Sequence, residues 1–146
     1  NWAVEVSEKM QGIGSLRWVF VSNNFRDEEI KVLNRLKEIA YCEYRTGCSN
    51  SDLDAHRRRA DFEVSFSNQQ VPVLSLLEGA YAGAIPIVDN DHGGCFARGS
   101  GVLFSDELVS FLKGESDFSR KDWLYLCGQY SFERFKFKIC NELHGS

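Results

Sequence analysis

The sequence lacks any hydrophobic run long enough to cross a membrane, and it lacks an excess of positive charge. Its longest apolar stretch, residues 71–88, is interrupted by Glu78, Gly79, Gly83 and Pro86, whereas a transmembrane helix needs about 20 consecutive apolar residues. The 17 basic residues are outnumbered by 21 acidic ones, which gives a formal charge of −4. We therefore expect no transmembrane segment and no broad nucleic-acid-binding surface, because such a surface needs a basic field along the phosphate backbone.

Paired cysteines and hydrolase motifs are missing as well. The five cysteines are odd in number and widely spaced, and no two of them form a C-x-x-C pair. Neither a disulfide framework nor a zinc site is expected from this pattern. It favours a reducing, cytoplasmic compartment. No G-x-S-x-G motif is present either, so nothing indicates a serine hydrolase.

The residues that are present suffice for one folded domain. A chain of 146 residues has the length of a single domain. Its 43% hydrophobic residues can form a core, and its 26% charged residues are close to the average for soluble domains. We expect residues 1–15 to be an N-terminal linker or extension and residues 16–146 to form the domain.

Predicted strands and helices alternate along the chain. Runs of β-branched and aromatic residues, or alternating apolar and polar residues, predict strands at 16–21, 41–44, 62–66, 85–89 and 102–104. Apolar residues spaced by three and four predict helices at 26–40, 71–82 and 106–112 and two short helices within 121–143; a polar helix capped by Asn50 or Ser51 runs through Arg59. Alternation of this kind implies crossover connections, and hence an α/β, Rossmann-like three-layer domain with a mostly parallel sheet.

The loops that follow the strands are the candidate binding sites, because ligands of open parallel sheets bind at the carboxyl ends of the strands. Residues 67–73 lead into a helix whose free backbone N–H groups favour a diphosphate. Glu78 is the only charged residue between Glu63 and Asp89. We expect it to have a polar partner, since an unpaired buried carboxylate costs several kcal/mol. A ribose diol is one candidate partner, and an exposed position on the helix face is the alternative.

Two segments resemble a known enzyme family. They read S-D-L-D-A-H-R-R-R-A-D-F-E-V-S-F-S (51–67) and V-L-S-L-L-E-G-A-Y-A-G-A-I-P-I-V-D-N-D-H-G-G (73–94). Their pattern is similar to that of the donor-binding domain of group 1 glycosyltransferases, which have the GT-B fold. The matching residues, in order, are Ala60, Asp61, Ser67, Glu78, Gly83, Pro86, Gly93 and Gly94. The aromatic segment Y-S-F-E-R-F (130–135) also resembles the one that closes these domains.

The resemblance implies a site for a nucleotide diphosphate sugar and no required metal or other cofactor. Glu78 would bind the ribose of this donor. The basic residue that neutralises the leaving diphosphate would come from the loop after the first strand, where Asn24 and Arg26 are the candidates. The backbone of Val71, Pro72 and Val73 would face the diphosphate, and Arg45, Thr46 and Gly47 would lie near the base.

The chain departs from the family pattern at a catalytic position. Spacing places Gln70 where the family has the first glutamate of its E-x7-E motif, and an amide can hydrogen-bond a sugar but carries no charge. A GT-B active site also needs an acceptor domain, which would come from a separate N-terminal domain or a partner chain. One alternative is therefore a noncatalytic nucleotide-binding or interaction module. Another is a metal site at Asp89, Asp91 and His92.

Overall fold

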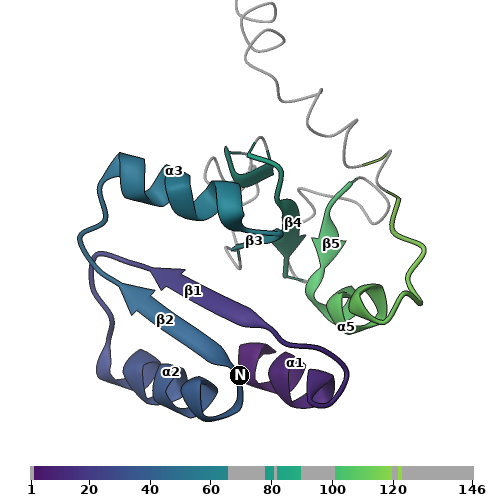
Figure 1. The fold of residues 1–146 in the computed structure, drawn as a ribbon, viewed down its shortest axis with the longest axis horizontal. Coiled ribbons are helices and arrows are strands. Elements are labelled where there is room, and N and C mark those ends of the chain that lie inside the picture. Colours follow the sequence, from purple (N-terminus) through teal and green to yellow (C-terminus); the bar gives the residue numbers. More distant parts are fainter. Residues whose placement is uncertain (1, 66–77, 81, 90–100, 120–121, 123–146) are drawn as a thin grey trace, which may run out of the picture.

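The computed structural model describes residues 2–65, 78–80, 82–89, 101–119 and 122. These residues form short parallel sheets covered by helices (Figure 1). The elements are, in order, α1 Trp2–Met10, β1 Arg17–Val21, α2 Asp27–Ile39, β2 Tyr41–Arg45, α3 Asn50–Arg59, β3 Phe62–Ser65, β4 Ile85–Val88, β5 Leu103–Phe104, the 3-10 turn η1 Ser105–Glu107 and α5 Leu108–Leu112.

Every strand pair in the described residues is parallel, which confirms the prediction of an α/β domain with a parallel sheet. The strands nevertheless form two sheets, β1-β2 and β3-β4-β5, where we had expected one. The exposed face of the first sheet is polar: Arg17, Glu43 and Arg45 lie on it, and Val19 and Val21 are more than a third exposed. A central strand of a doubly covered sheet would carry apolar residues on both faces.

The predicted elements agree with the structure to within one or two residues wherever the chain is described. The predicted cap of α3 is wrong, because the helix is capped by Ser49. The Ser49 hydroxyl accepts a hydrogen bond from the Asp52 backbone N–H at 3.2 Å, and the Asp52 carboxylate accepts one from the Ser49 backbone N–H at 3.4 Å. This reciprocal capping box satisfies two free N–H groups. Of the predicted helix 71–82, residues 78–80 are helical; residues 71–77 and 81 lie outside the described part of the chain, as do residues 123–143 of the predicted tail.

Residues 1–15, the expected linker or extension, contain helix α1, which packs between the two sheets. Val6 and Met10 are buried against Ile87, Leu103 and Leu108. The preceding turn of the same helix, with Ala3 and Val4, is buried against Leu36 of α2. Helix α1 therefore belongs to the core of the domain, which extends back to Trp2.

A chain of hydrogen bonds fixes α1 within this core. The indole N–H of Trp18 on β1 donates to the Ser7 hydroxyl at 2.8 Å, and that hydroxyl donates to the Ala3 carbonyl at 2.8 Å. On the other side, the Trp2 indole N–H donates to the Ser105 carbonyl at 2.9 Å. The two indole rings meet edge to face, with 5.7 Å between their centroids. Polar atoms buried at this junction are thus satisfied, as buried donors require.

We predict that Met10→Ala lowers the free energy of unfolding by about 2 to 4 kcal/mol, because it leaves a cavity where α1 meets β4 and β5. Ile13→Ala is the control, since Ile13 is 56% exposed and its truncation should change stability by less than about 0.5 kcal/mol. Denaturant unfolding of both variants provides the measurement. Equal losses in the two variants would show that α1 is not part of the core.

Candidate functional site

The carboxyl ends of β1 and β2 lie at one edge of the first sheet. Val21 is paired with Arg45, and the Ser22 backbone N–H donates to the Arg45 carbonyl at 3.2 Å. The Ser22 hydroxyl donates to the Asn24 carbonyl at 2.8 Å and accepts from the Asn24 backbone N–H at 3.3 Å. This turn holds Asn24 at the strand end. The loops that contain two of the predicted site segments, Asn24 and residues 45–47, are therefore neighbours.

Arg26 lies at the start of α2, where its side chain is engaged locally. Its Nε donates to Glu29 Oε1 at 2.7 Å, and this hydrogen bond lowers the pKa of the Glu29 carboxyl. The Arg26 side chain is 77% exposed. Surface pairs of this kind contribute little to stability. An anionic ligand could therefore recruit Arg26 at low cost.

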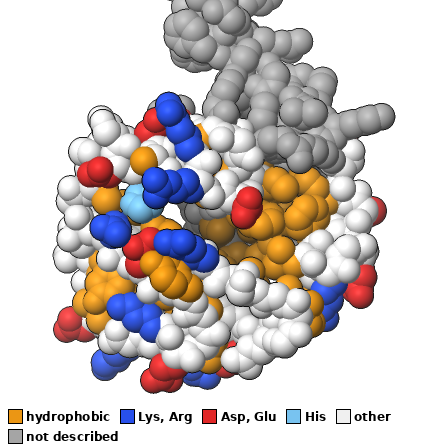
Figure 2. Space-filling view, in the orientation of Figure 1, with side chains coloured by type: hydrophobic (Ala, Val, Ile, Leu, Met, Phe, Trp, Pro, Cys, Tyr) orange, Lys and Arg blue, Asp and Glu red, His pale blue; other side chains and the backbone are white. Residues whose placement is uncertain are grey.

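Residues 45–47 line a shallow hollow of about 610 Å³ between the β2 loop and α3. Four α3 residues at helical spacing form its other wall. Gly47 adopts a φ of +66°, a conformation that side-chain-bearing residues rarely adopt. The described residues that line it are Arg45, Thr46, Gly47, Cys48, Asp52, Ala55, His56 and Arg59. Figure 2 shows Lys and Arg side chains gathered over α3, beside the pale blue of a histidine.

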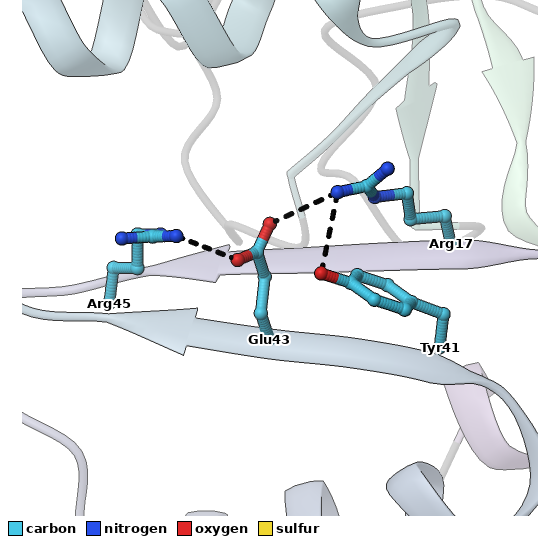
Figure 3. A network of polar contacts seen from close by, with 4 residues as sticks. All are labelled: Arg17, Tyr41, Glu43 and Arg45. Atoms are coloured by element: carbon cyan, nitrogen blue, oxygen red, sulfur yellow. Dashed lines mark hydrogen bonds and ion pairs between the residues drawn. The ribbon is translucent and has the colours of Figure 1, made fainter.

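Arg45 is held at the hollow by a network across the exposed face of the first sheet (Figure 3). Its Nη2 donates to Glu43 Oε2 at 3.0 Å, and the other oxygen of that carboxylate lies 3.8 Å from Arg17 Nη2. The Arg17 guanidinium also lies over the ring of Tyr41, 4.3 Å from its centroid, and donates to the tyrosine hydroxyl at 3.3 Å. Glu43 therefore holds Arg45 in place. Its single negative charge is shared by Arg17 and Arg45 and cannot neutralise both.

Three successive arginines of α3 point to three different places. Arg58 is exposed and pairs with Asp54 one turn earlier at 2.9 Å, as expected for a solvated helix face. Arg59 lines the hollow described above. Arg57 points inward, with a side chain only 12% exposed. Arg57 is thus not part of a solvated helix face, because acidic side chains from distant parts of the chain contact it.

Glu78 is the direct partner of Arg57. Its Oε2 accepts from Arg57 Nη1 at 2.8 Å, and the Glu78 side chain is half exposed. Glu63 on β3 lies on the other side of the guanidinium, with its Oε1 3.6 Å from Arg57 Nε. That separation is too long for a hydrogen bond, and the buried Nε–H has no other partner among the described residues. The polar partner expected for Glu78 is therefore present, and it is an arginine.

The position of Glu78 differs from the one that the resemblance implies. Residues 78–80 form the end of the crossover helix, and the turn at Ala82 and Gly83 follows before β4 begins. Next to Glu78, Gly79 approaches the early β3 residue Glu63 so closely that a Cβ on Gly79 would lie 2.7 Å from the Glu63 side chain. Glu78 therefore lies beside the amino half of β3, whereas a donor is expected at the carboxyl ends of the strands.

Four further predicted site residues, Gln70, Val71, Pro72 and Val73, lie outside the described residues, as do Asp91 and His92 of the alternative metal motif. Arg57, Glu63, His56 and Arg59 were not among the predicted site residues. A signal for His56 and Arg59 was available, because Asp52, Ala55, His56 and Arg59 recur at spacings of three and four on one face of α3. No local signal pairs Arg57 with a carboxylate 21 residues away.

We predict that the free energy of unfolding of the protein falls, relative to that of its Glu63→Gln variant, as the pH rises above 4.5. Burial raises the pKa of the Glu63 carboxyl above its ordinary value of 4.5, although the positive charge of Arg57 opposes this shift. Because the folded-state pKa is raised, the contribution of Glu63 to stability is complete below 4.5 and is lost as the pH rises through the raised pKa. Denaturant unfolding of both proteins from pH 4.5 to neutrality measures the difference. A difference that does not change with pH would contradict the prediction.

No family model, curated protein or solved structure matches the chain. Within the described ranges, no group of three or more His, Cys, Asp or Glu side chains is arranged to hold a metal ion. No helix in that same part of the chain is long and apolar enough to span a bilayer.

Proposed function

We propose that this chain binds a nucleotide diphosphate sugar and acts as the donor-binding part of a glycosyltransferase. One observation carries the proposal: two adjacent parallel strands, β1 and β2, end at the same edge, beside a hollow lined by Arg45, Thr46 and Gly47. Strand ends of this kind are where open parallel sheets bind nucleotides. The resemblance of residues 51–67 and 73–94 to group 1 glycosyltransferases gives the same ligand class.

In this proposal, Arg26 stabilises the charge that develops on the leaving diphosphate. Its present partner, Glu29, is 40% exposed, so a diphosphate can compete for the guanidinium. Asn24 adds a neutral hydrogen-bonding group at the same strand end, and Gln70 would hydrogen-bond the sugar. The backbone N–H groups near Val71 and Val73, at the start of the crossover helix, would bind the diphosphate. Sugar transfer would further require an acceptor domain.

The pair formed by Glu78 and Arg57 favours a second candidate, a noncatalytic nucleotide-binding or interaction module. The 2.8 Å contact with Arg57 occupies one carboxylate oxygen of Glu78, so a ribose would have to share this carboxylate with a largely buried guanidinium. The uncharged Gln70 favours the same candidate. Both candidates can bind a nucleotide. Only the glycosyltransferase would transfer the sugar.

We predict that Arg26→Ala weakens binding of nucleoside diphosphates and their sugars about tenfold or more, because charge-assisted hydrogen bonds contribute about 1.5 to 3 kcal/mol. Calorimetric titration with uridine, guanosine and adenosine diphosphates and the corresponding diphosphate sugars measures this. Arg35→Ala is the matched control, since Arg35 is an exposed α2 arginine paired with Glu8, and it should bind like the wild type. If none of these ligands binds the wild type, the proposal fails.

Glu78→Gln separates the two roles of Glu78. The amide keeps an acceptor for Arg57 but loses the negative charge. If Glu78 binds ribose, we expect weaker nucleotide binding in this variant, whereas a purely structural pair with Arg57 would change only the unfolding midpoint. Donor hydrolysis, or sugar transfer after addition of an acceptor domain, supports the glycosyltransferase. Binding without either reaction supports the noncatalytic module.

A further inference from the structure

We propose that the hollow between the β2 loop and α3 binds a phosphate group through Arg45, His56 and Arg59. This inference deepens the proposed function. It rests on that function only for the identity of the complete ligand to which the phosphate belongs. The resemblance would place a neutral base near residues 45–47. The side chains that line the hollow are better suited to an oxyanion.

The chemical character of the lining differs from that of a typical base pocket. Base and cofactor pockets are lined mainly by apolar and aromatic side chains with a few polar groups. Among the described residues, Ala55 is the one purely aliphatic side chain in this hollow, and no Phe, Tyr or Trp ring is part of its lining. Two arginines and a histidine are present instead. Guanidinium groups match the oxygens of phosphate with two parallel hydrogen bonds, which makes arginine a preferred phosphate ligand.

The charges in the hollow are only partly compensated. Arg59 forms no ion pair with any carboxylate among the described residues, and His56 forms none either. Asp52 is the one acid in the lining, and its carboxylate is used at the helix start by the Ser49 hydroxyl and backbone N–H, at 2.9 and 3.4 Å. An incoming anion would therefore find two guanidinium groups and an imidazole with free donors.

The hollow is also partly preorganised. Glu43 holds Arg45 on the β2 side at 3.0 Å. His56 and Arg59 are three residues apart, on one face of α3, and so project from the same side of that helix. The anion would then be bound between two elements, with Arg45 on one side and the α3 pair on the other. Groups held in place before binding lose less conformational entropy when the ligand arrives.

The test is titration of the full chain with inorganic phosphate and pyrophosphate, followed by ³¹P NMR and calorimetry at constant ionic strength. We expect Arg59→Ala to weaken phosphate binding about tenfold or more, as expected when a charge-assisted contact is lost. His56→Gln should weaken it to a smaller extent. The matched control is Arg58→Ala, because Arg58 is the adjacent arginine of α3 but pairs with Asp54 outside this hollow.

The outcomes separate this inference from the proposed function. Loss of phosphate binding in Arg59→Ala but not in Arg58→Ala supports the site, even if no nucleotide diphosphate binds and the donor proposal fails. Equal losses in the two variants would indicate a general charge effect and overturn the site. Phosphate binding that is unchanged in Arg59→Ala, or absent from the wild type, overturns it as well, even if nucleotide diphosphates bind through Arg26.

Discussion

The packing of helix α1 between the two sheets is the contact on which the rest of the structure depends. One side of the helix buries Val6 and Met10 against β4, β5 and α5, and the preceding turn packs on α2. The two sheets share no strand pairing in the described residues, so apolar burial around α1 takes the place of a continuous hydrogen-bonded ladder. Ser7, bonded to Trp18, fixes the helix against β1. The candidate site at the ends of β1 and β2 is thereby held relative to β3 and β4.

Helix α3 is attached to the structure in a different way. None of its residues is fully buried, so hydrophobic packing contributes little to its position. Its inward contact is Arg57, which lies between Glu63 of β3 and Glu78. A partly buried ion pair contributes more to the orientation of a helix than to the stability of the fold, because the desolvation of the charges offsets much of their attraction. The cluster therefore orients α3, and with it the wall of the hollow that contains His56 and Arg59.

Much of the fold could be predicted from the sequence. The strand at Phe62 and the helix at Asp27 follow from apolar periodicity and an acidic first turn, and both lie within a residue or two of their predicted limits. The candidate site was predicted less completely. Residues 45–47 do line a hollow, but the predicted ribose ligand, Glu78, lies beside the amino half of β3. The helix that contains Glu78 could be predicted from the sequence, whereas the orientation of Glu78 toward Arg57 depends on how the crossover packs.

After α1, the sequence by itself determined the order and type of the described elements, because hydrophobic periodicity and cap chemistry act over a few neighbouring residues. The Ser49 capping box and the positive φ of Gly47 are likewise local. Only the tertiary structure decided that α1 is part of the core, and that Arg57, Arg58 and Arg59 have three different surroundings. Those outcomes depend on contacts between residues far apart in the chain, which become neighbours only when the crossovers have packed against the sheets.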